Sequence, residues 1–245
     1  MDEITKAYFI ARKDMRAYYL KPPLVSWGLI LPIVFVLAFY LRNPMGIKEI
    51  VPGLIGMTLL FSSTSMAAIV IAFEKRIGAL ERLLLAPLNI TTILLGKTLG
   101  SAVFGLIITF LITIFLILII DIPVQHFFSF VFIIVLSGLA FSLLGIFVSV
   151  GVKEVFEAMT LSNFFRFPMI FLCGVFFPIS SMPFPLPILS YLLPLTYTVD
   201  GLRQCLPGHN GAIPLWVNLL ILIAFVILIY FLSHSVFKER IRQEF

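Results

Sequence analysis

Six long runs of uncharged, mostly apolar residues divide this chain. A transmembrane α-helix needs about 20 consecutive apolar residues, and each run is close to that length. We therefore predict an all-α integral membrane protein with six transmembrane helices. The fourth run is long enough to tilt or to extend past the bilayer. The runs cover residues 24–41, 51–73, 98–120, 127–152, 159–177 and 213–233.

Before the first run, apolar residues recur with the spacing of one helical face. These residues are Ile4, Tyr8, Ala11, Met15 and Tyr18. Basic residues fill much of the remaining surface, which predicts an amphipathic helix lying in the inner headgroup region. Pro22 and Pro23 are expected to end it before the first span. A frayed basic leader that only sets orientation is the alternative. We divide the chain into this interfacial helix, residues 1–23, and a six-span transmembrane domain, residues 24–245.

The segment between the second and third runs has a helical pattern of its own. It reads EKRIGALERLLLAPLNI over residues 74–90, and Ile77, Leu80 and Leu84 share one face. Acidic and basic side chains occupy other positions, and Pro87 closes the helical part. We predict a short amphipathic helix between spans 2 and 3 with its polar surface toward the cytosol. The alternative is a charged interfacial turn.

A proline-rich stretch follows the fifth run. Residues 167–199 contain no Asp, Glu, Lys or Arg, although they include several prolines. Such a segment is apolar enough for a bilayer but too interrupted for one straight helix. We predict that residues 178–212 form one or two re-entrant helices in the outer leaflet. Asp200 and Arg203, which follow the uncharged stretch of residues 167–199, are spaced for an i,i+3 ion pair.

Composition and charge agree with a membrane protein and orient it. The chain is 61% hydrophobic and 12% charged, with mean hydropathy +1.13, whereas soluble domains are roughly a quarter charged. If both termini are cytoplasmic, only Arg42, Lys48 and Arg203 of the 17 Lys and Arg residues lie outside. By the positive-inside rule, both termini are therefore expected in the cytoplasm. We expect a multi-pass protein of the plasma membrane, the inner membrane of the cell. The net charge of +5 is a topology signal, and we expect no nucleic-acid partner.

Sequence motifs for catalysis are missing. The chain has no P-loop, no HExxH and no GxSxG, so we predict no catalytic or metal-binding residues and no cofactor in this chain. Cys173 and Cys205 form no metal or redox motif, although a disulfide between them stays open. Arg166 is the charge that falls clearly within a span, and it either has a functional role or extends toward the inner headgroups.

Small polar residues and glycines recur inside the spans. Gly96 and Gly100, like the stripe Gly138, Ser142, Gly145 and Ser149, have the spacing of close helix packing. Lining a substrate path is the alternative explanation for such residues. The candidates for path lining are Ser62, Ser65, Thr109 and Asn163.

Two stretches resemble a known family. FEKRIGALERLLLAPLNITTILLGKTLG, residues 73–100, is similar to the charged segment before span 3 in ABC-2 type permeases. FLCGVFFPISSMPFPLPILSYLLPLTYTVDGLR, residues 171–203, resembles their glycine-aromatic-proline element and proline-rich outer segment. The chain looks more like the drug- and lipid-exporting branch than the O-antigen branch. Cys173 stands where the family usually has serine or threonine.

The resemblance implies a machine of several chains. Two permeases, here expected as a homodimer, would enclose a path above two cytoplasmic ATPase subunits that hold ATP and Mg²⁺. The segment 74–90 would be the coupling helix, and the N-terminal helix would lie beside it as the connecting helix. The residues implied in ATPase coupling are Glu74, Lys75, Arg76, Glu81 and Arg82. Those implied in an outer gate are Phe176, Phe177, Pro178, Pro183 and Pro185.

The expected function is ATP-driven export of an amphipathic, drug-like or lipid-like solute, with membrane lipids as further partners. The chain itself would not be an enzyme, because the ATPase motifs lie on another subunit. An ion-coupled secondary transporter or a channel that works without an ATPase is the alternative. An intramembrane enzyme is a third class, but the sequence offers no nucleophile–base pair for it.

Overall fold

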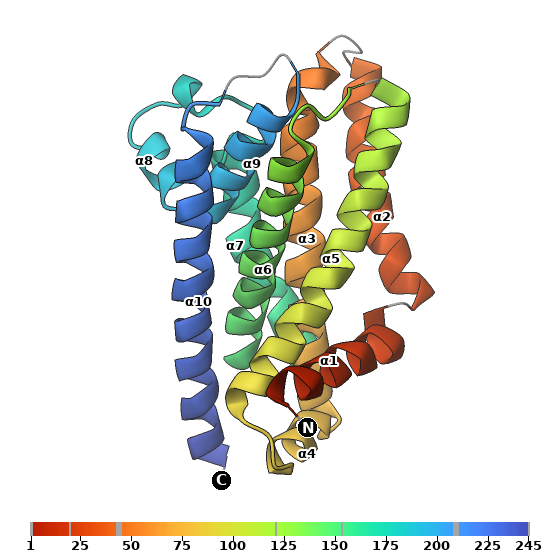
Figure 1. Ribbon diagram of the computed structural model, residues 1–245, viewed down its shortest axis with the longest axis vertical. Coiled ribbons are helices and arrows are strands. Elements are labelled where there is room, and N and C mark those ends of the chain that lie inside the picture. Colours follow the sequence, from red (N-terminus) through yellow and green to blue (C-terminus); the bar gives the residue numbers. More distant parts are fainter. Residues whose placement is uncertain are drawn as a thin grey trace.

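The computed structural model describes residues 2–19, 21–42, 46–120, 122–152, 154–207 and 211–244, and for residues 22–29, 31 and 240–244 the backbone alone. Throughout these residues the regular structure is helical. Long helices run side by side along one axis (Figure 1). Both chain ends lie at the end of the bundle that carries α4 (the α4 end). The opposite end carries α8 (the α8 end).

The lengthwise helices coincide with the six apolar runs. Among the described residues, α3, α5, α6 and α10 are long and apolar enough to cross a membrane. The prediction of an all-helical membrane protein is therefore confirmed, whereas the number of spans stays a prediction. The six helices are α2 (Pro22–Arg42), α3 (Ile47–Arg76), α5 (Ile90–Ile120), α6 (Phe127–Val150), α7 (Val155–Leu172) and α10 (Leu215–Glu244).

Helix α3 is the centre of the bundle. It contacts α2, α5, α6, α7 and α9, and 83% of its most apolar stretch is buried, against 17% for α10. Small residues bring its neighbours close. A Cβ at Gly145 of α6 would lie 2.4 Å from the carbonyl oxygen of Thr64, so only glycine fits this crossing. The predicted role of this small residue is therefore helix packing.

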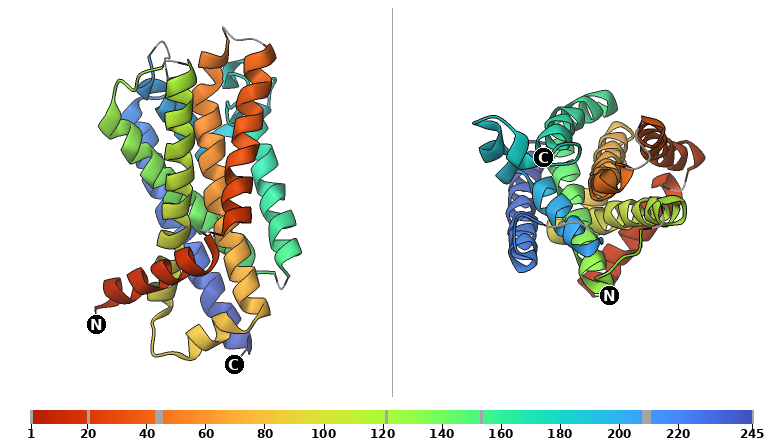
Figure 2. Two further views of the ribbon diagram at one scale, coloured as in Figure 1. Left: turned by 90° about the vertical axis from the view of Figure 1, so that its right-hand side faces the viewer. Right: turned by 90° about the horizontal axis from the view of Figure 1, so that it is seen from above.

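Helix α1 (Glu3–Asp14) crosses the bundle near the α4 end, at a steep angle to the other helices (Figure 2). It packs on the start of α5, where a Cβ at Gly96 would lie 2.7 Å from Cβ of Ile10. A π-helical turn, Met15–Tyr19, follows it. The helical run from Glu3 ends at Tyr19, before Pro22 and Pro23, as the sequence predicted. Pro22 then begins α2, where its fixed φ and missing N–H cost nothing.

The segment between α3 and α5 forms a helix shorter than predicted. Helix α4 covers Ala79–Leu85, because α3 continues through Arg76 and Gly78 turns the chain at φ 66°. Positive φ is readily accessible to glycine. The seven residues of α4 therefore lie at the lower end of the bundle in Figure 1 and connect α3 to α5.

Three short helices close the α8 end. They are η2 (Ile179–Ser181), α8 (Leu186–Tyr191) and α9 (Pro194–Cys205). The fifth apolar run was predicted to be helical to residue 177, but α7 ends at Leu172 and Gly174 turns the chain at φ 77°. One or two short helices were predicted over residues 178–212, and the structure has these three there. Most of α9 is buried, and its polar residues Thr198 and Asp200 bond inside the protein instead of facing water.

Candidate functional site

Four charged side chains meet where α1, α3 and α5 come together at the α4 end. Lys97 Nζ lies 2.8 Å from Asp14 Oδ2 and also donates to Glu74 Oε2. Lys13 Nζ lies 2.6 Å from Glu74 Oε1 and 3.1 Å from Asp14 Oδ1. The side chains of Asp14 and Glu74 are fully buried, and Lys97 is almost so. We call these four residues the charged cluster.

The charged cluster carries two positive and two negative groups, so its charges balance. Burial raises the pKa of Asp14 above its ordinary value, although the nearby Lys97 and Lys13 ammonium groups work against that rise. Burial alone would lower the pKa of Lys13, but Glu74 and Asp14 outweigh it and raise that pKa. Because removing one partner of a buried ion pair is costly, the cluster holds α1 firmly against α3 and α5.

A second contact joins the same end of α3 to α6. Lys75 Nζ donates to the carbonyl oxygens of Val150 at 2.6 Å and Val152 at 3.2 Å, at the C-terminus of α6. A cation there satisfies free carbonyl groups and complements the helix dipole. Through Glu74 and Lys75, the last turn of α3 is bonded to α1, α5 and α6.

The structure divides the predicted coupling residues into two groups. Glu74 and Lys75 point into the protein, as just described. Arg76, Glu81 and Arg82 are exposed at the α4 end. Arg82 also donates from Nε to the carbonyl oxygen of Gly78 and from Nη2 to that of Ile77, each at 3.1 Å. The surface open to a partner chain is therefore α4 with the end of α3, supported from within by Glu74 and Lys75.

Sequence reasoning counted Lys97 only among the cytoplasmic charges and assigned Asp14 no role. Their partners are far away in the chain, since Asp14, Glu74 and Lys97 belong to three different helices. One signal was available. Lys97 follows directly on Gly96, within a segment whose glycine spacing predicted close packing, and close packing buries its neighbours.

Helix α3 has one face that the rest of the chain leaves partly open. Between Val51 and Ala72 every residue of α3 is buried except Phe61, Ser65 and Ile69, and the exposed Phe73 continues this spacing of four. Residues four apart lie on one side of a helix. We call Phe61, Ser65, Ile69 and Phe73 the α3 stripe.

Arg166 of α7 lies against this stripe. Its Nη1 donates to Ser65 Oγ at 2.6 Å, its Nε donates to the carbonyl oxygen of Ser162 at 3.2 Å, and its Cζ is 5.0 Å from the centre of the Phe61 ring. The residue is only 3% exposed, so it does not extend to the protein surface. The sequence left two interpretations of Arg166, and the one in which its side chain extends to the inner headgroups does not fit this burial.

The four candidates for path lining occupy two kinds of position. Ser62 and Thr109 are buried between helices, and the Ser62 hydroxyl donates to the carbonyl oxygen of Thr58 in its own helix. Ser65 and Asn163 are partly exposed. The structure therefore brings Ser65, but neither Ser62 nor Thr109, to an accessible surface next to Arg166.

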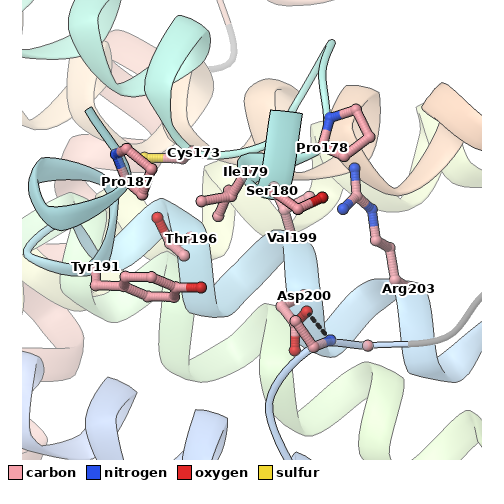
Figure 3. A pocket seen from close by; sticks show the side chains of 12 residues that line it. Cys173, Pro178, Ile179, Ser180, Pro187, Tyr191, Thr196, Val199, Asp200 and Arg203 are labelled. Carbon is pink, nitrogen blue, oxygen red and sulfur yellow. Dashed lines mark hydrogen bonds between the residues drawn. The ribbon is translucent and has the colours of Figure 1, made fainter. Parts of the chain in front are cut away.

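At the α8 end, the outer segment and α9 enclose a cavity of about 310 Å³ (Figure 3). Arg203 points toward Pro178 at its edge, and its Nη2 donates to the carbonyl oxygen of Gly174 at 2.5 Å. Asp200 turns instead to the segment before α10 and accepts hydrogen bonds from the backbone N–H of Ala212 at 2.7 Å and of Ile213 at 3.2 Å. Asn218 Nδ2 donates to the same carboxylate at 2.8 Å.

The expected ion pair between Asp200 and Arg203 is absent from the described part of the chain, because each side chain bonds to backbone groups. The two thiols are also separate. Cys173 and Cys205 are both buried and not bonded to each other. Among the described residues, no group of three or more His, Cys, Asp or Glu side chains gathers as a metal site would require.

The five predicted gate residues lie in and beside this outer segment. Phe176 stacks on Phe39 of α2 with ring centres 5.4 Å apart and also contacts Phe35 and Phe171. The others are exposed, and one of them, Pro178, lines the cavity. These others are Phe177, Pro178, Pro183 and Pro185. Phe176 is thus the gate candidate that joins the outer segment to the long helices.

Comparison with known proteins places this architecture. The family model described as "ABC-2 type transporter" matches residues 5–206. This chain belongs to the ABC-2 type transporter family. The resemblance of its two sequence segments to ABC-2 permeases is thereby confirmed. Members of this family are transport permease components, not enzymes, and the apolar helices agree with a place in the membrane.

Two named relatives of this ABC-2 chain are permeases, and a third is a nodulation protein. It is 28% identical over 190 residues to the inner membrane transport permease YadH of Escherichia coli strain K12, covering 78% of this chain and 74% of YadH. It is 27% identical over 219 residues to the probable multidrug ABC transporter permease YbhS of the same strain, covering 86% of this chain and 57% of YbhS. The nodulation protein J of Sinorhizobium fredii is 30% identical over 110 residues, or 44% of this chain and 41% of that protein.

Proposed function

We propose that this chain is the membrane-spanning permease subunit of an ATP-driven exporter. It would form, with a second copy of itself, the path of an amphipathic, drug-like or lipid-like solute. Separate cytoplasmic ABC ATPase subunits would bind and hydrolyse ATP with Mg²⁺. The observation that carries this proposal is α4, a short exposed helix attached on both sides to long bundle helices and braced from within by Glu74 and Lys75.

The proposed topology has six spans, namely α2, α3, α5, α6, α7 and α10. The α4 end faces the cytoplasm in this assignment, because the Lys and Arg residues concentrate there. Both termini lie at that end (Figure 1), as an even number of spans requires. Helix α1 would lie in the inner headgroup region, and η2 and α8 would be the re-entrant helices of the outer leaflet.

The proposed coupling step begins at Arg76, Glu81 and Arg82. A force applied to α4 is delivered to α3 through a single turn, which Arg82 stiffens by its bonds to Ile77 and Gly78. Because α3 is bonded to α1, α5 and α6 at this end, it cannot move there alone. A push on α4 would therefore tilt these helices together, which supports a transport stroke at the α3 stripe.

The second permease copy is expected beside α3 and α7. Ser65 and Asn163 give this side some polar surface, while Phe164, Phe167 and Phe171 of α7 are exposed. A surface of this mixed kind suits an amphipathic solute moving between two copies. The relative YbhS is named a probable multidrug permease, which supports the same class of solute.

Replacing Glu81 and Arg82 together by alanine tests the coupling surface. We expect the variant to fold and to enter the membrane, but to lose most substrate-stimulated ATPase activity and ATP-driven export in proteoliposomes. A matched control is Lys238→Ala with Glu239→Ala, which removes the same two charges from the exposed end of α10, outside α4. Unchanged stimulation in the α4 variant would refute the coupling assignment.

Co-purification tests the larger proposal. A stoichiometric partner with a P-loop in its own sequence is the expected result. Transport by this chain alone, driven by an ion gradient, would instead identify a secondary transporter or a channel.

A further inference from the structure

A cavity at the α4 end joins the α3 stripe. Its volume is about 410 Å³, within the range of roughly 300–1,000 Å³ of small-molecule sites. Ile69 and Phe73 belong to both the cavity and the stripe. Among the described lining residues, Lys21 is charged and the others are apolar or aromatic. The lining residues are Ala17, Tyr18, Lys21, Ile69, Val70 and Phe73.

The α3 stripe continues from this cavity to Arg166. Ser65, which accepts the hydrogen bond of Arg166, is one helical turn beyond Ile69 and two beyond Phe73. At 1.5 Å per residue, the stripe between Phe73 and Ser65 is roughly 12 Å long. An apolar surface of this length thus has a lysine at one end and an arginine at the other.

Arg166 has no counter-charge within the described residues. The groups recorded around its guanidinium are a backbone carbonyl, a hydroxyl and an aromatic ring, all of them neutral. The ion pairs of the described chain all belong to other residues. Elsewhere in this protein a deeply buried cation, Lys97, is matched by two carboxylates. A buried charge without such a match is costly, so the missing negative charge is expected from outside the chain.

We propose that the α3 stripe and Arg166 form a binding site for an anionic amphiphile with a single hydrocarbon tail. Its carboxylate or phosphate headgroup enters past Lys21 and binds the Arg166 guanidinium, while the tail lies along Ile69 and Phe73. This inference rests on the proposed transport function and assigns the charge of the solute.

The geometry favours an anion at this place. A guanidinium has more N–H donors than Ser65 and Ser162 use, and it binds carboxylates and phosphates through paired hydrogen bonds. Ser65 is partly exposed, so an entering headgroup can replace its hydroxyl as the acceptor of Nη1. A cationic solute would be repelled at both Lys21 and Arg166, and a neutral one would gain nothing from either charge.

Binding of matched probes tests the proposal. The chain of residues 1–245, with any partner that co-purifies, is placed in phosphatidylcholine nanodiscs without ATP. Retention of radiolabelled hexadecanoate, hexadecyl phosphate and neutral hexadecanol is then compared with retention by empty discs. We expect the protein to retain both anionic probes about tenfold better than hexadecanol, a ratio typical of one charge-assisted contact. Equal retention of all three probes would overturn the proposal.

Variants of the two basic residues make the test specific. Arg166→Gln should lower retention of both anionic probes about tenfold and leave hexadecanol unchanged. Lys21→Gln should have a smaller effect of the same sign, since Lys21 is exposed. Arg12→Gln is the matched control, because it removes one positive charge from the exposed surface of α1. Wild-type retention of anions by Arg166→Gln would refute the site.

If Arg166→Gln does not fold, Ser65→Ala tests the anion site instead. It leaves the positive charge in place and removes the hydroxyl that accepts from Nη1, so anion retention should rise about two- to threefold. A fall in retention would contradict the proposal. If added phosphatidylglycerol displaces the probes, the site binds the headgroup of a resident lipid; if it does not, the site selects single-chain anions.

The transport function and the charge assignment can fail separately. ATP-driven export that is equal for hexadecanol and hexadecanoate and is unchanged by Arg166→Gln would leave the exporter standing and remove the anion site. Charge-selective binding without any ATP-dependent export would support the anion site and refute the proposed export function.

Discussion

Replacing Lys97 by methionine should destabilise this protein strongly. Methionine nearly matches the length of the lysine side chain, so the main change is the loss of its charge. Asp14 and Glu74 would then remain as two buried carboxylates, with only the half-exposed Lys13 to balance them. The net charge of the charged cluster would change from zero to minus one.

The size of the effect follows from the burial of the cluster. Breaking a buried ion pair by removing one partner costs about 3–5 kcal/mol. Lys97 contacts both carboxylates and is almost completely buried, so this full range applies to it. A second substitution, Asp14→Asn, restores a neutral cluster of Lys13 and Glu74. The double variant should therefore regain about 1–3 kcal/mol of the loss, the cost of one uncompensated buried group.

Unfolding in mixed micelles, followed by the loss of helical circular dichroism during titration with sodium dodecyl sulfate, measures both variants. The expected order of stability is wild type, then the double variant, then Lys97→Met. Two results would refute the reasoning. One is a Lys97→Met protein as stable as the wild type, and the other is a double variant less stable than Lys97→Met.

Two further predictions concern packing and pH. Gly145→Ala places a Cβ 2.4 Å from a backbone oxygen of α3 and should cost about 1–3 kcal/mol, whereas Gly138→Ala, with its nearest atom at 3.5 Å, should unfold like the wild type in the same titration. Burial raises the pKa of Asp14 above the ordinary 3.8, so its contribution to the free energy of unfolding is fully present below that value and declines as pH rises through the raised pKa. The stability difference between wild type and Asp14→Asn should therefore fall as the pH rises above the ordinary pKa of 3.8, and a difference that grows with pH would contradict the assignment.

Much of the fold could be predicted because long apolar runs have few alternatives in a membrane. The helix ends could not be predicted in the same way. Helix α5 begins at Ile90 and not at residue 98, because Lys97 reads as a boundary charge although the folded chain neutralises it with Asp14 and Glu74. Periodicity within a segment carries no information about partners that far away.

The exposed residues of the candidate site could be predicted from the sequence, whereas its buried contacts between helices could not. The charges of α4 are on the surface, as an amphipathic pattern implies. Glu74 has the same charge as Glu81 in the same segment, yet only Glu81 is exposed. What separates them is that α3 continues as a helix past Glu74 into the region covered by α1. Arg166 shows the same limit, since its neighbour Ser65 comes from a helix far back in the sequence.

The central position of α3 has a consequence for biosynthesis. Among the helices that could span the membrane, α3 is the most buried, and it carries the hydroxyls of Ser62, Ser63, Thr64 and Ser65 together with Glu74. Its main partners α5 and α6 follow it in the chain and are therefore still unmade when α3 leaves the ribosome. A newly inserted α3 must expose these polar groups to lipid or to the insertion machinery until α5 and α6 arrive. A ribosome that stalls after α3 would leave in the membrane the helix least suited to remain there alone.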